Sequence, residues 1–558
     1  MNKNKIFITL AIILIIFSIG IRLLSIDKDI SAEESDFLKP AISLMETGHP
    51  IYYNSEQLKE ELALWHPPMF LFSLSFISNF INIEIGARAL NIFYSILTSF
   101  LIFLLAFKLS NKENKLFTGL LSSLIFLISY YSLSSSLLID LDTSSALFIF
   151  IFISSLILAR KENNYLYYFP ASLSLTLALF NRYPIAILAF GVSFLYFIKK
   201  DFKEKNKNHS KFLFFSGLIS IITFLLIWSF YSVIIEPNTF FSFINHNAKL
   251  GISQISSFKV YLVSFLINIT QLIRLNTLPF IILSFLAISY YIKHRKEEFN
   301  LYILSSLTII IFFILLPRPA FGYPRYFFSA LPLLIIPLSF YINETLSRIK
   351  NKELKLSIII SIMSLIIILL LKPIPVFYTS KGLILSSNFF DLISYILPVL
   401  TLFLIIFMRN KRIIFITSLF LIFILQSAYL SVIYLQHDSQ TKEVGEFIKS
   451  VTSENDILIS PKAVGYYSQR KFYNNDNNKP SFSLSKDYIF EYLSKTYNSP
   501  NMDDKFFWPN DVYGGLYPPY PSKEELSEID YAVTYYPLTD QILIKKLGDF
   551  YVYKIKYN

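Results

Sequence analysis

Two groups of carboxylates in this sequence are spaced closely enough to act on one substrate. The first falls within ten residues, directly after the first long apolar run, and comprises Asp27, Asp29, Glu33, Glu34 and Asp36. It could be a solvated acidic loop that orients the chain, or it could supply a general base for an acceptor hydroxyl. The second group, Asp140 and Asp142, precedes another apolar run. Asp142 would begin that helix, where a carboxylate can cap the helix and still take part in chemistry.

Three arginines at the ends of apolar runs could bind the anion that such a reaction releases. Arg182 stands in Asn181-Arg182-Tyr183-Pro184, and Arg318 and Arg325 stand in the segment 317–326. An isolated arginine at a membrane edge often only extends toward lipid headgroups. Its planar fork is equally well suited to phosphate. Transfer from a lipid-phosphate donor requires a base and an anion site that face the same compartment. The acids could supply the base, and the arginines could supply the anion site.

The apolar runs around these residues indicate a membrane protein. Of the 558 residues, 54% are hydrophobic and only 16% are charged, against about 25% charged residues in a soluble domain. This composition excludes a soluble enzyme and a disordered chain. The sequence has no Cys, which excludes disulfides, iron–sulfur clusters and thiolate zinc sites.

Thirteen runs are long enough, or nearly long enough, to cross a bilayer. They are 6–26, 87–109, 116–134, 143–159, 165–181, 183–198, 212–235, 277–292, 301–316, 326–342, 356–371, 391–408 and 413–435. A shorter run, Met69–Ile83, follows His66-Pro67-Pro68 and is expected to lie in the interface or to re-enter the membrane. With a cytoplasmic N-terminus, the cytoplasmic segments hold 23 Lys/Arg and 8 Asp/Glu, whereas the outward loops between spans hold 11 Lys/Arg and 13 Asp/Glu. This asymmetry favours thirteen spans, with residues 436–558 outside.

The residues after 435 change in character, because apolar runs shrink to strand length and acids outnumber bases by 17 to 14. We expect helices at 442–451 and 487–497, strands at 456–460, 530–535 and 550–556, a further element at 466–473, and a long loop at 498–521. The predicted architecture is therefore a polytopic all-α membrane module, residues 1–435, with a first outer loop at about 27–86. A small extracytoplasmic α/β domain, residues 436–558, follows it.

In their order along the chain, these motifs resemble the GT-C glycosyltransferases of the protein-mannosyltransferase and aminoarabinose-transferase type, glycosyltransferase family 39. Glu33-Glu34 is similar to the acidic pair after span one, followed by a small-residue helix that ends near Gly48. The matches that come later are His66-Pro67-Pro68, Asp142, Asn181-Arg182-Tyr183 and the segment from Arg325-Tyr326 to Pro332. This chain departs from the family pattern at Glu33, where the family has Asp, and at His66, where it has a phosphate-binding Lys.

The resemblance implies a GT-C fold of thirteen spans and an enzyme of the cell membrane. It implies inverting transfer of a sugar from a polyprenyl-phosphate donor to a hydroxyl of a glycolipid, glycan or protein on the extracytoplasmic face. The implied catalytic residues are Glu33, Glu34 and Asp142, with Glu33 as the base. The implied donor-phosphate ligands are Arg182, Arg325, His66 and Tyr326, and His246 would contact the acceptor or the sugar.

Other interpretations remain open at this point. No cofactor is obligatory in the expected mechanism, although the first-loop acids could hold a divalent metal, and no nucleic-acid partner is expected. The main alternative is a transporter or flippase of lipid-linked sugars, which would need inverted repeats or helices broken at mid-membrane. A structural or sensory membrane protein, in which the acids only orient the chain, is a further alternative.

Overall fold

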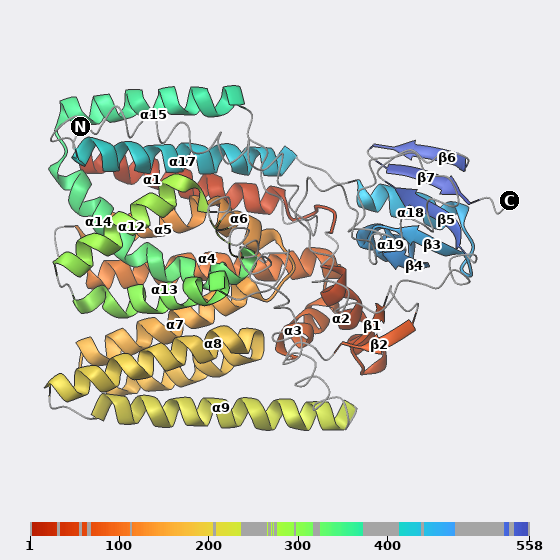
Figure 1. Cartoon of the computed structure of the whole chain (residues 1–558), viewed down its shortest axis with the longest axis horizontal. Helices are drawn as coiled ribbons and strands as arrows, with labels where there is room; N and C mark the ends of the chain where they lie inside the picture. The colour runs from red at the N-terminus through yellow and green to blue at the C-terminus, as the bar shows by residue number, and fades with distance from the viewer. Residues whose placement is uncertain are drawn as a thin grey trace.

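The computed structural model describes residues 3–30, 34–54, 59–63, 68–111, 114–204, 208–235, 265, 269, 272, 276–294, 297–315, 324–371, 412–436, 440–474, 529–534, 541–548 and 550–555. In this part of the chain, long helices run side by side in a bundle, and a small sheet domain lies beyond one end of it (Figure 1). We call this end of the bundle the domain end. The helices of the bundle are α1 (Lys3–Leu24), α4 (Ile83–Leu109), α5 (Lys115–Ile128), α6 (Tyr130–Leu137), α7 (Asp142–Lys161), α8 (Tyr168–Glu204), α9 (Asn208–Ile235), α12 (Leu278–Lys293), α13 (Asn300–Leu315), α14 (Leu331–Arg348), α15 (Asn351–Leu371) and α17 (Arg412–Gln436).

The bundle has the length and composition of a membrane domain. Among the described residues, seven helices are long and apolar enough to cross a membrane, or eight if the bent pair α5–α6 is one span. Every predicted run coincides with a helix or with half of one, except 116–134, which covers the pair α5 and α6, and 391–408, which lies outside the described residues. The chain is therefore a multi-pass membrane protein, whereas the number of thirteen spans stays a prediction.

Helix α8 consists of two antiparallel halves that meet at Arg182, where φ −134° and ψ 76° leave the helical region. A straight helix of its 37 residues would be about 55 Å long. Both of its ends nevertheless contact the start of α9: the Tyr168 hydroxyl lies 3.1 Å from His209 Nδ1, and Asp201 accepts from the Ser210 N–H at 2.6 Å. The predicted runs 165–181 and 183–198 are thus joined by the predicted turn, with Pro184 in the first turn of the second half.

The predicted run 116–134 is not one straight helix, because α5 and α6 meet at a bend of 60°. Ser129 leaves the helical region there, with φ −54° and ψ 125°. The carbonyl groups in the last turn of a helix need partners from outside it, and buried Arg22 of α1 donates to the Leu127 carbonyl at 3.0 Å. Arg22 also binds the hydroxyls of Ser132 at 3.0 Å and Ser136 at 3.1 Å, so one side chain fixes α6 to the end of α5.

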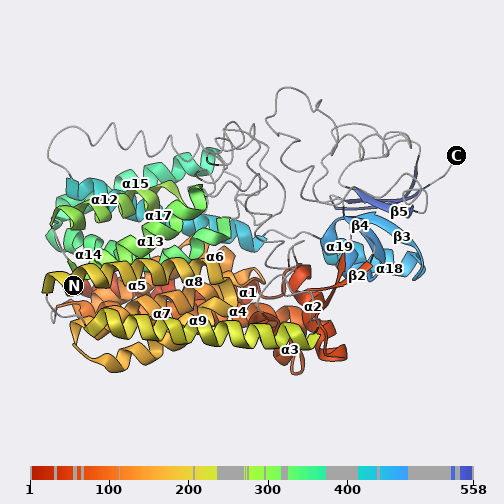
Figure 2. The same ribbon diagram turned by 60° about the horizontal axis from the view of Figure 1, so that its bottom comes forward.

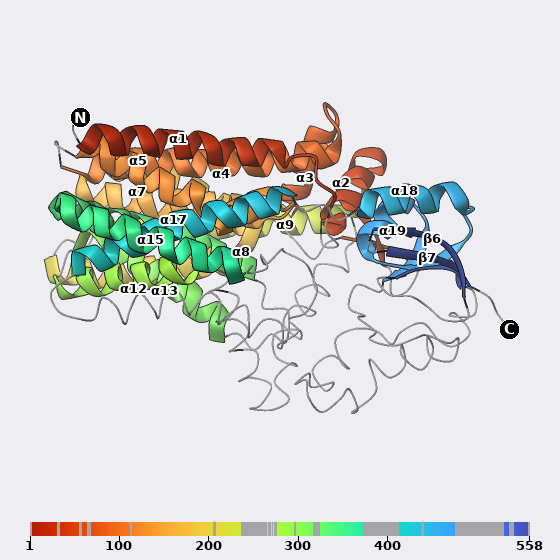
Figure 3. The ribbon, with the colours of Figure 1, turned by 90° about the horizontal axis from the view of Figure 1, so that it is seen from above.

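The first loop folds into defined elements at the domain end: α2 (Ser35–Thr47), β1 (Ile51–Asn54), β2 (Lys59–Leu62) and α3 (Met69–Ser78). Helix α2 lies between the bundle and the sheet domain (Figures 2 and 3). It ends at Gly48, whose φ of +77° is the left-handed conformation that favours glycine. β1 and β2 form an antiparallel hairpin. Helix α3 confirms the short helix predicted after the Pro67-Pro68 pair.

One apolar cluster, which we call the outer core, packs these elements together. Its buried members are Ile30, Phe37, Leu38, Ala41, Phe70, Leu71, Leu74, Ile83, Ala87, Ile139, Leu141 and Ala463. They come from the first loop, α3, α4, the segment between α6 and α7, and the sheet domain. Burial of these side chains therefore fixes the two acidic groups of the sequence relative to each other.

The C-terminal part is a small α/β domain, as predicted. Its elements are α18 (Thr441–Val451), β3 (Ile457–Ser460), α19 (Lys462–Ser468), β4 (Lys471–Asn474), β5 (Ile529–Thr534), β6 (Ile542–Leu547) and β7 (Phe550–Lys554). The sheet order is β4-β3-β5-β7-β6, with β3 parallel to both of its neighbours and the remaining pairs antiparallel. Strand β6 was not predicted, since most of its side chains are exposed and Lys545-Lys546 interrupts its apolar pattern. The predicted helix 487–497 and loop 498–521 lie outside the described residues.

Candidate active site

Arg182 holds two carboxylates at the start of α7. Its Nε and Nη2 donate to the two oxygens of Asp142 at 3.0 and 3.2 Å, and Nη2 also donates to Asp140 Oδ1 at 2.9 Å. Arg182 is only 6% exposed and each aspartate 2%, so this is a buried ion network. Arg182 therefore does not extend toward lipid headgroups. Pairing with a guanidinium is what allows two carboxylates to be buried side by side.

The local sequence explains why these aspartates point into the protein. Ile139 and Leu141 alternate with Asp140 and Asp142, and both apolar side chains are buried in the outer core. Ser144, one turn into α7, donates to Asn181 Oδ1 at 2.8 Å. This bond joins the start of α7 to the turn that carries Arg182, so the acids and their arginine are held by one local structure.

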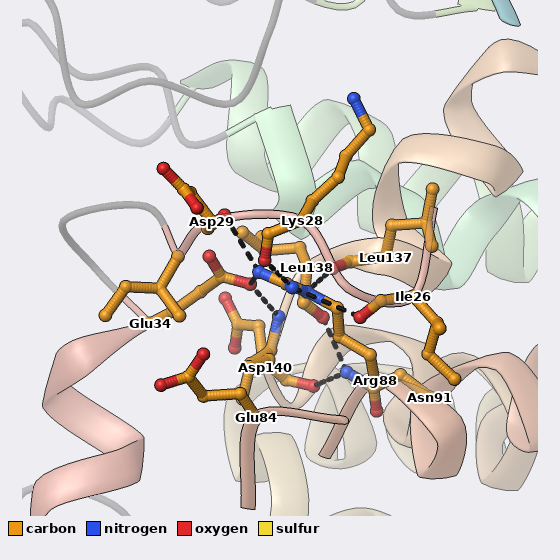
Figure 4. A network of polar contacts seen from close by, with 12 residues as sticks. Ile26, Lys28, Asp29, Glu34, Glu84, Arg88, Asn91, Leu137, Leu138 and Asp140 are labelled. Carbon is orange, nitrogen blue, oxygen red and sulfur yellow. Dashed lines mark hydrogen bonds and ion pairs between the residues drawn. The ribbon is translucent and has the colours of Figure 1, made fainter. Parts of the chain in front are cut away.

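Arg88 of α4 is the centre of a second buried network (Figure 4). Its Nη2 lies 3.5 Å from Glu34 Oε1 and donates to the Asp29 carbonyl at 2.9 Å. The same guanidinium donates to the carbonyls of Ile26, Lys28 and Leu137. Arg88 thus binds the start of the first loop and the end of α6 at once.

Glu34 and Asn91 connect the two networks. Glu34, which is 3% exposed, accepts the Ile139 N–H at 2.9 Å. The Asn91 amide donates to the carbonyls of Leu138 at 2.6 Å and Asp140 at 3.1 Å. The segment that presents Asp140 and Asp142 is therefore bound along its backbone by groups from α4 and from the first loop.

The other predicted site residues are distributed differently. Glu33, His66 and His246 lie outside the described residues. Arg325 and Tyr326 lie in a 3-10 helix, Pro324–Ala330, that packs against α7, with Ser329 Oγ 3.4 Å from Ser145 Oγ. The structure therefore brings the segment of Arg325 to the first turn of α7, which begins with Asp142.

Two residues of the site were not predicted as functional. Arg88 stands inside a predicted apolar span, and a charge in such a place is itself a signal of a buried partner. Asn91 carried no comparable signal, because an isolated Asn near a span end is common. Its role depends on carbonyls that lie almost fifty residues further along the chain.

Within the ranges given above, no group of three His, Asp or Glu side chains is arranged to hold a metal ion. The suggestion of a divalent metal at the first-loop acids therefore stays a prediction.

Known proteins resemble this chain both in sequence and in structure. Residues 65–228 match the model of the dolichyl-phosphate-mannose-protein mannosyltransferase family. The fold is similar to that of ArnT from Cupriavidus metallidurans bound to undecaprenyl phosphate, with a TM-score of 0.58, 11% identity, and coverage of 98% of this chain and 97% of that chain. The apo state of ArnT gives a TM-score of 0.56, 10% identity and 97% coverage of both chains. This chain has a GT-C fold.

The predicted resemblance to GT-C glycosyltransferases is thereby confirmed, together with the predicted fold class. The part of this GT-C chain that matches the family model includes Asp140, Asp142 and Arg182, while Glu34 and Arg325 lie outside it. No curated protein has a matching sequence.

Proposed function

We propose that this protein transfers a sugar from a polyprenyl-phosphate donor to the hydroxyl of a glycolipid, glycan or protein acceptor on the extracytoplasmic face of the cell membrane. The observation that carries the proposal is the buried Asp140–Asp142–Arg182 network at the domain end of a GT-C bundle. Buried charge inside a membrane protein is costly and marks functional sites by default. The family match and the similarity to ArnT bound to undecaprenyl phosphate support a lipid-phosphate donor.

In the proposed reaction, Glu33 acts as the general base. It takes the proton of the acceptor hydroxyl while the hydroxyl oxygen attacks the anomeric carbon from the face opposite the phosphate. The bond between that carbon and the phosphate oxygen breaks, and its electron pair leaves with the polyprenyl phosphate. The products are an inverted glycoside, a protonated Glu33 and the lipid phosphate.

The contacts of Glu34 and Asp142 favour supporting roles for these two acids. Glu34 is paired with Arg88 and already accepts the Ile139 N–H. Both oxygens of Asp142 accept from Arg182. A carboxylate whose lone pairs are occupied by a guanidinium is a poorer proton acceptor. Glu33 precedes Glu34 directly, so the anchoring of Glu34 would also restrain the base.

The leaving phosphate needs positive charge, and we assign this role chiefly to Arg325, assisted by His66 and Tyr326. Arg182, predicted for the same role, donates three hydrogen bonds to the carboxylates of Asp140 and Asp142. We assign to Arg182 the role of keeping Asp140 and Asp142 in place, and its contact with the donor phosphate stays a prediction. His246 is retained as a candidate contact to the acceptor or the sugar.

The test is transfer of a labelled sugar from a polyprenyl-phosphate donor by the purified protein in lipid nanodiscs. Glu33→Gln keeps the shape of the side chain but cannot accept the proton, so turnover should fall about a hundredfold while donor affinity stays nearly unchanged. Glu454→Gln, at an exposed position in the turn after α18, is the matched control and should transfer normally. Normal turnover in Glu33→Gln would show that Glu33 is not the general base. Donor movement across vesicles without any transfer would instead favour a flippase.

A further inference from the structure

The C-terminal domain contacts the first loop on both sides of the predicted base. Glu33 lies outside the described residues, and the described residues nearest to it in the sequence are Ile30 and Glu34. The domain binds Asp29 and Ile30, which precede Glu33 in the sequence, and Asp36, which follows it.

Tyr467 of α19 makes the most specific of these contacts. Its hydroxyl accepts the Ile30 N–H at 3.1 Å and donates to Glu84 Oε2 at 3.2 Å. The ring packs against the outer core, beside Ala463 of the same helix. One phenol from the C-terminal domain therefore ties the backbone of the first loop to the first turn of α4, one helical turn before Arg88.

Asp29 of the first loop binds the first helix of the C-terminal domain. Its Oδ2 accepts from the Lys442 N–H at 3.0 Å and from the Thr441 hydroxyl at 3.2 Å. These groups lie at the N-terminus of α18, where the helix's first N–H groups and its dipole favour a carboxylate. The first loop thus supplies the cap of a helix in the other domain.

An ion pair is the contact that follows Glu33 in the sequence. Lys462 Nζ lies 2.5 Å from Asp36 Oδ1, in the first turn of α2. Lys39, one turn further along α2, is close enough that burial, followed by the charge of Lys462, lowers its pKa to about 8, against the opposing effects of Asp36 and Glu60. The contact between α2 and the C-terminal domain is therefore shielded from water.

We propose that the C-terminal domain holds the catalytic loop in its reactive position, with Tyr467 as a positioning residue that acts through Ile30 and Glu84. The inference rests on the proposed transfer reaction and on Glu33 as its base. Tyr467, Lys462 and the start of α18 bind residues 29, 30 and 36, and Arg88 binds Glu34 from the bundle side. The described residues on either side of Glu33 in the sequence are thus bound by two different parts of the chain.

Tyr467→Phe is the sharpest test, because it keeps the ring in the outer core and removes only the hydroxyl. We expect kcat for sugar transfer to fall about tenfold, less than the hundredfold that a full 1 Å misplacement can cost. The KM for the donor should stay within about twofold, since the lipid-phosphate contacts are elsewhere. Hydrogen exchange of the Ile30 amide should become faster, because this amide loses its acceptor.

Tyr531→Phe is the matched control. It removes a phenol that binds the Val451 carbonyl at 3.4 Å inside the C-terminal domain. This variant should keep wild-type kcat and wild-type exchange at Ile30. Wild-type kcat in Tyr467→Phe would overturn the proposal, whether or not exchange at Ile30 changes.

A charge exchange tests the second contact. Lys462→Glu places a carboxylate against Asp36 and should lower kcat, whereas Lys462→Glu combined with Asp36→Lys restores the attraction and should recover most of it. A double variant no better than Lys462→Glu alone would contradict the proposed role of the ion pair.

If the wild-type protein transfers no sugar from any polyprenyl-phosphate donor, the proposed function fails. The exchange comparison at Ile30 then still decides whether Tyr467 holds the loop.

Discussion

At the scale of single residues, Arg88 joins more parts of the candidate site than any other described side chain that we have named. It pairs with Glu34 and donates to carbonyls on either side of the site, at 26–29 and at Leu137. We predict that Arg88→Met lowers the free energy of unfolding by about 3–5 kcal/mol, because it leaves the Glu34 charge buried without its partner. Thermal unfolding of the detergent-solubilised protein measures this loss, and transfer activity should disappear with it.

A double variant distinguishes the effect of the unpaired charge from the effect of altered packing. Arg88→Met with Glu34→Leu removes both charges, so it should be more stable than Arg88→Met alone. Glu34→Gln keeps an acceptor for the Ile139 N–H and should cost less than Arg88→Met. If Arg88→Met unfolds at the wild-type temperature, the buried pair does not hold the site together.

Sequence reasoning located the acids but not their partners. Asp142 and Glu34 were predicted as site residues from position and from family resemblance, and both are buried among charges at the domain end. The pairing of Asp142 with Arg182 joins residues forty positions apart. Such a pair depends on how α7 packs against the turn in α8, which no local pattern contains. The sequence could therefore indicate Asp142 and Glu34 as candidates, but it assigned Arg182 only to phosphate.

At the scale of elements, the break between α5 and α6 was not predictable from helix-breaking residues. The segment 129–136 is rich in serine, and serine hydroxyls compete with the backbone for hydrogen bonds. What stabilises the break lies in another helix: Arg22 of α1 binds Leu127, Ser132 and Ser136. A broken helix is also a feature that the transporter alternative requires, but this one leads directly into the segment that presents Asp140 and Asp142.

We predict that Arg22→Met slows sugar transfer by about ten- to a hundredfold, because α6 is no longer fixed and the acids that follow it shift. Ser136→Ala removes only one of these hydrogen bonds and should cost about 1 kcal/mol of stability with a smaller loss of rate. Transfer kinetics and thermal unfolding of both variants distinguish the two effects. An Arg22→Met protein with normal turnover would show that the bend is set by packing alone.

At the scale of the whole molecule, the two ends of the bundle differ in charge and in architecture. The far end carries basic helix termini such as Arg160 and Lys203, and Arg160 pairs there with Asp201. The domain end carries the acidic networks and the α/β domain. Basic residues accumulate on the cytoplasmic side of membrane proteins. We therefore infer that the far end is cytoplasmic and that the candidate site and the C-terminal domain are extracytoplasmic.

The absence of cysteine makes this orientation directly measurable, since any introduced thiol is the only one in the chain. Lys203→Cys in the last turn of α8, at the far end of the bundle, and Glu454→Cys in the turn after α18, in the C-terminal domain, are both exposed positions. In intact cells, a membrane-impermeant maleimide should label Glu454→Cys fully and Lys203→Cys only after permeabilisation. The cysteine-free parent gives the background. Labelling of Lys203→Cys in intact cells, with Glu454→Cys protected, would show that the orientation is the reverse of the one inferred. The site would then face the cytoplasm, and an extracytoplasmic acceptor could not reach it.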